Sequence, residues 1–462
     1  MSLPRRARAA ALIAVVLAGV SVAACTSQAP QPHSSAAPTD TTSPPVPLPG
    51  SPAARAPATA ARIYDVLRDM SVKAFNPSAP PVSGARRPGG LFINWRGSWN
   101  GDSATATANT NIQESGVPDQ EAGSASRHDP LTDLTYLVNL YAFQAIYPQD
   151  RQFVADAARI EPLVKQEWDT GSYYRCWVYF QFRDLDELRP GQGWGVIADR
   201  FAAAVYRYYY NTQAGAIADP RHDGVYRTDF AAECGAMLID AGYREHNAAF
   251  TAAGNSALAH LVQRAQNPQT HLFPLQMQLG PARDTVVQAQ VTVGEEAQLL
   301  NAFLDAYDLT RNKSYLDAVV RATASMYSPA IGLWDTVHGG FLFSVDADGS
   351  DLQAHYKESR QAWMLPLLAQ LARIEHGGVW AAREQQMLTV VRGLLWQPSI
   401  DGYPYRVTPG FAIYQSTDGP GHSRVTEDWV TSEAMGIACE ALASQLLPLS
   451  LSSDMKDPRS GI

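Results

Sequence analysis

The sequence contains few cysteines and none of the compact motifs that bind metals or nucleotides. Its four cysteines, among 462 residues, include no CxxC pair of the kind that zinc sites use. The HExxH, EF-hand, P-loop and dinucleotide-binding glycine patterns are missing, as is the GxSxG elbow of serine hydrolases. The stretch DADGSD at 346–351 is similar to the start of a calcium loop but lacks the closing glutamate. We therefore expect no metal ion and no cofactor.

Basic clusters and long apolar runs are also scarce. Lys and Arg number 36 against 45 Asp and Glu, a formal net charge of −9. Beyond the N-terminus no Lys/Arg-rich run offers a surface for nucleic acid, and no apolar run after residue 25 is long enough to span a bilayer. Cys176, Cys234 and Cys439 allow one disulfide and a spare thiol, without indicating which two pair.

The N-terminus has the pattern of a secretory signal. Arg5, Arg6 and Arg8 precede the apolar run ALIAVVLAGVSVAA, which ends directly at Cys25. The VAAC ending resembles a bacterial lipobox, which implies that Cys25 is lipidated and becomes the mature N-terminus. The alternative is an ordinary signal peptide cleaved near Ala24. The lipobox interpretation predicts an extracytoplasmic protein anchored to the bacterial cell membrane.

Composition divides the chain into four parts. Residues 1–25 form the predicted signal peptide. Residues 26–58, rich in Pro, Ser, Thr and Ala, cannot bury enough apolar surface to fold and are predicted to be a disordered tether. Residues 59–448 are long enough for one large catalytic domain, and 449–462 are expected to be a flexible tail.

Apolar residues recur at helical spacing through the whole of the large domain. The segments alternate between helices that follow long loops, with polar residues in the first turn, and plainer amphipathic helices that follow short turns. This alternation predicts an all-α fold, an (α/α)6 barrel with inner and outer helices. An α-solenoid is less favoured because no fixed repeat period is present. The predicted helices are 60–75, 129–146, 150–168, 172–185 (helix or strand), 194–211, 227–242, 246–265, 295–309, 314–327, 357–374, 380–396 and 426–446.

One segment between two predicted helices is not helical. WDTVHGGFLFSVDADG, at 334–349, combines a Gly-Gly pair, an aromatic run and an Asp-rich turn. These features predict a β-hairpin closed at Asp348-Gly349. In an (α/α)6 barrel such short hairpins would lie over the barrel mouth, at the N-terminal ends of the inner helices.

The stretch 291–374 resembles the six-hairpin glycosidase-like group, and within it the N-acylglucosamine 2-epimerase and cellobiose 2-epimerase families. The shared features are an inner helix from Glu295, an outer helix from Tyr315, a hairpin from Asp335 to Gly349 and a Lys-bearing helix from Lys357. The resemblance implies a sugar-acting toroid.

The sequence departs from the epimerases at their catalytic histidines. Gly294 is followed by Glu295 and Glu296 where those families have a histidine, and the stretch 401–422 offers no counterpart of their second one. Carboxylates in place of histidines fit glycoside hydrolysis better than proton transfer at carbon.

Glycoside hydrolysis uses two carboxyl groups, one protonated and one ionised. Candidates should lie in the first turns of inner helices, where plain N-capping is the competing explanation for each of them. Glu233 is flanked by Ala and Cys in an apolar helix, so burial should raise its pKa unless it is paired. The candidate catalytic residues are Asp133, Asp229, Glu233, Glu295, Glu296 and Glu427.

A second set of residues is predicted to bind sugar. Aromatic rings stack on the apolar faces of sugars, although core packing is the commoner fate of any one tryptophan. Cations at a helix N-terminus indicate an anionic partner, either a neighbouring carboxylate or a uronate. The candidate substrate-binding residues are Trp95, Trp99, His128, Trp334, Lys357, Arg360 and Trp429.

Together these observations predict a monomeric, lipid-anchored glycoside hydrolase that acts on an oligo- or polysaccharide. One alternative is a sugar epimerase or polysaccharide lyase that uses His128, Tyr226 or His422 for proton transfer. Another is a toroid without catalytic activity that binds glycan. A hydrolase needs two carboxyls at hydrolytic spacing, an epimerase or lyase needs His or Tyr beside Arg, and a binder needs only aromatic rings.

Overall fold

The computed structural model describes residues 94–96, 107–109, 130–146, 148, 151–169, 175–222, 224–376, 378–400, 402–419, 423–430 and 432–445. The predicted signal peptide with Cys25, the tether, the helix at 60–75 and the C-terminal tail lie outside these residues. The same holds for Trp99, His128 and His422.

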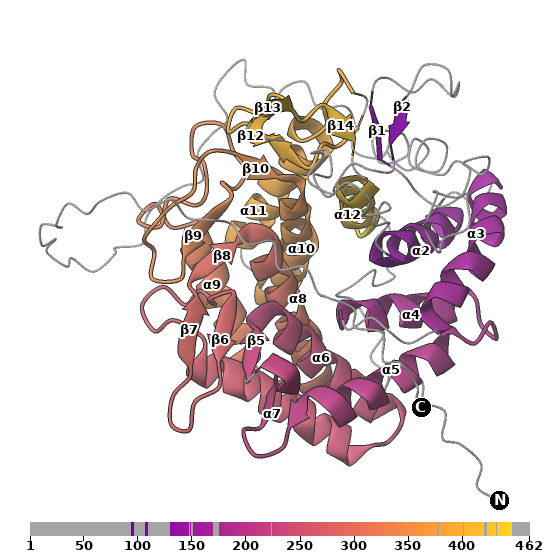
Figure 1. Cartoon of the computed structure of the whole chain (residues 1–462), viewed down its shortest axis with the longest axis vertical. Coiled ribbons are helices and arrows are strands. Elements are labelled where there is room, and N and C mark those ends of the chain that lie inside the picture. The colour runs from indigo at the N-terminus through magenta and orange to yellow at the C-terminus, as the bar shows by residue number, and fades with distance from the viewer. Residues whose placement is uncertain are drawn as a thin grey trace, which may run out of the picture. The chain divides into compact units, whose positions relative to one another are not determined.

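Alternate helices pack side by side and close a ring (Figure 1). Each of these inner helices contacts the next, and α12 contacts α2. Helix α10 is directly preceded by a short 3-10 turn, η4 (Ser359–Trp363). This turn contacts both α8 and α12. The inner helices are α2 (Pro130–Ile146), α4 (Trp177–Leu188), α6 (Thr228–Arg244), α8 (Val293–Thr310), α10 (Met364–Glu375) and α12 (Ser432–Ala443).

The intervening helices pack on the outside of this ring. Each outer helix contacts the inner helix that precedes it. The outer helices bury one face, as α7 does, whereas the inner helices are buried almost all round, as α6 is. The outer helices are α3 (Gln152–Asp169), α5 (Trp194–Tyr209), α7 (Ala248–Arg264), α9 (Lys313–Met326) and α11 (Gly378–Thr389), the last continued by a π-helical turn, η5 (Val390–Leu394). The predicted (α/α)6 barrel is confirmed.

Short strands occupy the connections and gather where inner helices begin. β5 leads into α6, β8 into α8, β10 into η4 and β14 towards α12. The sheet orders are β14-β1-β2, β5-β6-β7, β3-β4, β8-β9, β10-β11 and β12-β13. The strands are β1 (Asn94–Arg96), β2 (Thr107–Asn109), β3 (Tyr210–Asn211), β4 (Ala216–Ile217), β5 (Val225–Arg227), β6 (Gln276–Gln278), β7 (Thr285–Gln288), β8 (Gln290–Thr292), β9 (Ser344–Asp346), β10 (Lys357–Glu358), β11 (Arg406–Val407), β12 (Gln415–Gly419), β13 (Ser423–Thr426) and β14 (Trp429–Val430).

The predicted hairpin at 334–349 is more complex than the sequence indicates. A first turn through two glycines with positive φ joins Trp334 to Phe341 in an antiparallel bridge. A second turn, through Gly349, joins Ser344 to Gln353. The strand β9 between these turns pairs with β8, directly before α8. The hairpin is therefore fixed to the start of an inner helix.

Two helix predictions need correction at their ends. The predicted helix 357–374 begins instead with strand β10 and the 3-10 turn η4, and α-helix starts only at Met364. The predicted helix 426–446 starts at Ser432, after β14. The ambiguous segment 172–185 is helical from Trp177 onwards. In both corrected helices, residues expected in the first turns belong to paired strands instead.

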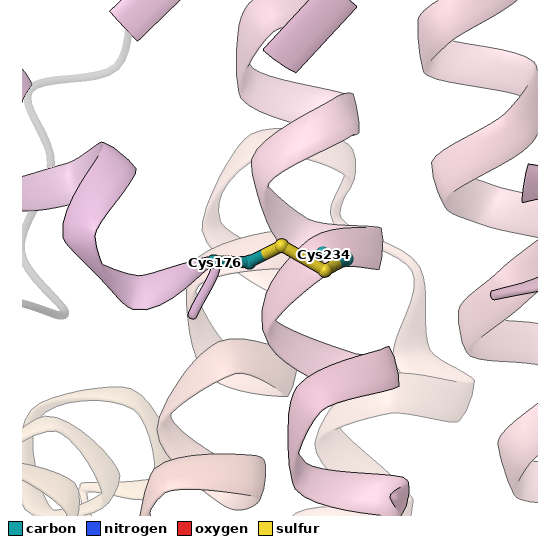
Figure 2. Close-up of a disulfide and its surroundings, with 2 residues drawn as sticks. All are labelled: Cys176 and Cys234. Atoms are coloured by element: carbon teal, nitrogen blue, oxygen red, sulfur yellow. A yellow bond between two sulfur atoms is a disulfide. The ribbon is translucent and has the colours of Figure 1, made fainter. Parts of the chain in front are cut away.

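A disulfide joins the residue before one inner helix, α4, to the second turn of another, α6 (Figure 2). Cys176, at the start of α4, bonds to Cys234 in α6, with their Cα atoms 4.9 Å apart. Cys439, in α12, is a buried free thiol. The structure thus makes the choice of pair that the sequence left open. None of the described helices has the length and hydropathy needed to cross a membrane.

Candidate active site

A chain of alternating charges connects the starts of neighbouring inner helices. Arg227, at the end of β5, donates from Nε to Asp229 Oδ1 at 3.0 Å and from Nη2 to Oδ2 at 2.6 Å. Arg360, in η4, contacts Glu295 Oε1 of α8 at 2.8 Å from Nη2. The Nη2 of Arg227 lies 3.6 Å from the same Glu295 oxygen. These four side chains link β5, α6, α8 and η4.

The chain extends at both ends. Arg175, directly before α4, places Nη1 3.8 Å from Asp229 Oδ2. Arg360 Nε lies 3.6 Å from Glu433 Oε1, in the first turn of α12. Carboxylates in first turns are favoured by the helix dipole, which accounts for their place here. We call Arg175, Asp229, Arg227, Glu295, Arg360 and Glu433 the charge arc. The side chains of Arg175 and Arg227 are 28% and 35% exposed, so solvent reaches the arc.

Glu233 lies one helical turn beyond Asp229 and is 2% exposed. The backbone N–H of Trp177 lies near its carboxyl, but neither oxygen makes a hydrogen bond of regular geometry to the described residues. Burial, helped by the charge of Asp229 and opposed by Arg175 and Arg227, raises the pKa of Glu233 to about 8. The carboxyl is therefore protonated at neutral pH.

Asp229 has the opposite character, although it is equally buried. Burial alone would raise the pKa of Asp229, but the charge and hydrogen bonds of Arg227, with the charge of Arg175, lower it below its usual value. Asp229 and Glu233 stand four residues apart, so both side chains lie on one face of α6. Their surroundings separate two carboxyls into one ionised and one protonated group, as acid–base chemistry requires.

The adjacent residues Glu295 and Glu296 have separate environments, as expected for neighbours on a helix. Glu295 belongs to the charge arc and also accepts a hydrogen bond from the Thr292 hydroxyl. Glu296 is buried, and its Oε1 accepts from the Phe273 backbone N–H at 3.4 Å. Burial raises the pKa of Glu296 well above its usual value. Of these two neighbours, only Glu295 belongs to the charge arc.

The other two candidate carboxylates, Glu427 and Asp133, belong to other parts of the fold than Glu233. Glu427 forms a two-point ion pair with Arg406, whose Nε lies 2.9 Å from Glu427 Oε2. The guanidinium of Arg406 lies over the rings of Tyr356 and Tyr414, at 4.8 and 5.2 Å. This arrangement favours a structural role for Glu427. Asp133 is fully buried in the first turn of α2.

Glu358, in β10, is a carboxyl that the sequence reasoning missed. It is 9% exposed, stands opposite Arg406 in the β10-β11 pair, and its carboxyl makes no hydrogen bond or ion pair with the described residues. Burial raises the pKa of Glu358 to about 8; Arg360 and Arg406 oppose the rise, and Glu295 and Glu433 add to it. The sequence predicts a helix from Lys357, whereas the structure begins this segment with strand β10, whose pairing determines which way Glu358 faces.

Lys357 anchors the hairpin from within. Its side chain is fully buried, and Nζ donates to Asp335 Oδ2 at 2.8 Å and to the carbonyls of Gly339 and Pro409 at 2.5 and 2.6 Å. The ammonium also lies 4.2 Å from the centre of the Phe411 ring. These contacts favour a structural role. Arg360, the other predicted cation, takes its anionic partners from the protein itself.

The predicted tryptophans have varied placements. Trp334 is buried against Tyr327 and Phe341, with ring centres 4.9 and 5.0 Å apart, which favours core packing. Trp95 and Trp429 stand on paired strands, because β1 pairs with β14 in antiparallel register. The sheet β14-β1-β2 therefore brings together two sequence regions that both carry a candidate.

The proton-transfer alternative relied partly on Tyr226. Its hydroxyl donates to Asp284 Oδ2 at 2.7 Å, and His260 Nε2 lies 2.7 Å from the same oxygen. On β5, Tyr226 and Arg227 are neighbours and so point to opposite faces. Tyr226 therefore points away from the charge arc. Within the described ranges, no cluster of His, Cys, Asp and Glu is arranged to hold a metal ion.

The sequence matches no protein-family model and no curated protein. Solved structures do match. An unsaturated glucuronyl hydrolase from Bacillus sp. GL1, responsible for glycosaminoglycan degradation, is 13% identical with a TM-score of 0.56, covering 83% of this chain and 96% of its own. A family 76 glycoside hydrolase from a bovine Bacteroides thetaiotaomicron strain is 10% identical, with a TM-score of 0.55 over 82% of this chain and 77% of its own.

A D-mannose isomerase is also similar, at 10% identity and a TM-score of 0.56, over 83% of this chain and 96% of its own. At such identities the likeness shows the fold alone. The chain shares the (α/α)6 fold of these proteins. The closer resemblance of 291–374 to the 2-epimerase families stays a prediction.

Proposed function

We propose that this protein is a glycoside hydrolase that acts on an oligo- or polysaccharide. The observation that carries the proposal is the pair Asp229 and Glu233, two buried carboxyls on one helix face with pKa values moved in opposite directions. Hydrolysis of a glycosidic bond needs this division between an acid and an ionised partner. The glycoside hydrolases among the structural neighbours support the assignment.

In the proposed reaction, Glu233 gives its proton to the glycosidic oxygen as the bond from that oxygen to the anomeric carbon breaks. The positive charge that develops on the sugar ring is stabilised by the ionised carboxylate of Asp229. A water molecule adds to the anomeric carbon and gives a proton to the Glu233 carboxylate, which restores the protonated acid. Arg227 holds Asp229 in the ionised state throughout, through its two hydrogen bonds.

Release of reducing sugar tests the proposal. The folded domain would be assayed on unsaturated glucuronyl oligosaccharides, α-1,6-mannan and a panel of bacterial and plant polysaccharides. We expect Glu233→Gln to lower kcat by roughly 10²–10⁴-fold, the usual contribution of a general acid. Glu440→Gln is the matched control, because Glu440 is also a buried carboxyl with a pKa raised to about 8, but near the C-terminal end of α12.

Other outcomes would decide against hydrolysis. Products absorbing at the wavelength of an unsaturated uronate would indicate a lyase, and conversion of a free aldose without new reducing ends would indicate an isomerase or epimerase. Binding of glycan without turnover would indicate a toroid that only binds. Full activity of Glu233→Gln would reject Glu233 as the acid.

We also propose that the protein is an extracytoplasmic lipoprotein. The support is the sequence of residues 1–25, in which a basic segment and an apolar run end at VAAC. Labelled palmitate should enter the full-length protein, and Cys25→Ser should abolish labelling and release the protein from the membrane fraction. Labelling of the variant at wild-type levels would contradict the lipobox.

A further inference from the structure

Each cysteine of the disulfide directly follows a residue of the candidate active site in the sequence. Cys176 follows Arg175 in the sequence, and Cys234 follows Glu233. The bond therefore joins the backbone positions next to a cation of the charge arc and next to the candidate acid. Both cysteines are fully buried. A covalent link at this place restricts how far the start of α4 can move from α6.

Among the described residues, few contacts hold the side chain of Arg175. Its one ion pair with the described residues is the 3.8 Å contact with Asp229, which is long for a hydrogen bond. Its Nε is buried and makes no hydrogen bond to the described residues. The guanidinium nevertheless supplies the largest attractive charge on Glu233 and also acts on Asp229. Its location therefore depends on the backbone, and the backbone is fixed one residue away by the disulfide.

We propose that the Cys176–Cys234 disulfide is a positioning element of the active site, which holds the guanidinium of Arg175 beside Asp229 and Glu233. Arg175 is then a positioning residue that adjusts both carboxyls without forming a tight ion pair with either. The proposal rests on the proposed function, because it concerns the same two carboxyls.

The charges around Glu233 determine what loss of Arg175 does. Arg175 comes from the segment before α4, Arg227 from β5 and Asp229 from α6 itself, while α8, which packs against α6, carries Glu295 and Glu296 in its first turn. Removing one of the two nearby cations raises the pKa of both Glu233 and Asp229. The acidic limb of the pH–rate profile reports Asp229 and the basic limb reports Glu233. Both limbs should therefore move to higher pH, by roughly one unit or more.

The experiment compares pH–rate profiles in a double-mutant cycle. One arm is Arg175→Met, and the other is Cys176→Ala with Cys234→Val, which retains much of the volume of the disulfide. We expect each arm to move both limbs upwards, and the combined variant to show no further movement. Cys439→Ala, which removes the buried free thiol, is the matched control and should leave the profile unchanged.

A direct titration of the Glu233 carboxyl, by infrared difference against Glu233→Gln, separates this proposal from the proposed function. If Glu233→Gln is fully active, the function fails, but the carboxyl should still titrate at higher pH in both arms. The positioning role is refuted if the disulfide variant folds and changes neither the Glu233 titration nor the pH–rate profile. It is also refuted if the effect of the disulfide variant adds to that of Arg175→Met. A disulfide variant that does not fold would also refute it, by assigning the bond to fold stability alone.

Discussion

Replacing Glu233 with glutamine should stabilise the protein at neutral and alkaline pH while it abolishes activity. The carboxyl is buried, its oxygens lack regular hydrogen bonds to the described residues, and its pKa is raised from 4.5 to about 8. An ionisable group in such a place lowers stability whenever the unfolded chain would ionise it. Glutamine has the same shape and no proton to lose, so the substitution removes this cost.

The size and pH dependence follow from the raised pKa. Because the folded protein binds this proton more tightly than the unfolded chain, stability is fully present below pH 4.5 and declines until about pH 8. At pH 7 the cost is on the order of 3 kcal/mol, and above pH 8 it approaches roughly 5 kcal/mol. Glu233→Gln should therefore match the wild type near pH 4 and exceed it increasingly at higher pH.

Urea denaturation of both proteins at pH 4, 7 and 9 measures the effect. Glu440→Gln is the control, because burial raises the pKa of Glu440 to about 8 as well; it should gain stability with the same pH dependence but keep full activity. A Glu233→Gln protein that is equally stable or less stable at pH 9 would refute the reasoning. It would show that the carboxyl is ionised and satisfied in the folded state.

Three further substitutions test the packing around the site. Lys357→Met should lower the free energy of unfolding by roughly 1–3 kcal/mol at pH 7, because Asp335 and the carbonyls of Gly339 and Pro409 lose the buried ammonium as a donor; equal urea midpoints would contradict the anchoring role. Gly254→Ala should cost ~1–3 kcal/mol, because the new Cβ would lie 2.7 Å from Ile239 Cγ1 and push α7 away from α6; an unchanged thermal midpoint would show that the helices can separate freely. Asp284→Asn should destabilise more at pH 7 than at pH 3. Burial would raise the pKa of Asp284, but its tyrosine, histidine and backbone donors lower it, so its stabilisation is lost as the pH falls; equal losses at both pH values would disprove the ionic contribution.

The sequence predicted the architecture well because helical periodicity is a local property. Inner and outer helices differ in how many faces are apolar, and that difference can be read from the residues alone. Glu233 could be identified in the same way, because a carboxyl between Ala and Cys in an apolar helix must be buried. The structure places it as expected, with a raised pKa.

Properties that depend on contacts distant in sequence were not predictable. Nothing near Lys357 in the sequence shows that its ammonium bonds to Asp335 and the Pro409 carbonyl, so the sequence leaves open whether a neighbouring carboxylate or a substrate is its anionic partner. The ion pair of Glu427 with Arg406 is equally unpredictable, because Arg406 comes from a different hairpin. Glu358 was missed because strand pairing with β11, and not local periodicity, determines which way it faces.

The start of α8 gives the strongest argument for hydrolysis over epimerisation. Where the 2-epimerase families have a catalytic histidine, this chain has Glu295, held by Arg360, Arg227 and the Thr292 hydroxyl. Gly294 permits this arrangement, since a Cβ there would lie 2.9 Å from Arg360 Cβ. Glu295 is thus engaged by the ion pairs and the hydrogen bond of the charge arc, whereas the buried carboxyl of Glu233 is protonated beside the ionised Asp229. The proposed hydrolysis uses this division between a protonated and an ionised carboxyl.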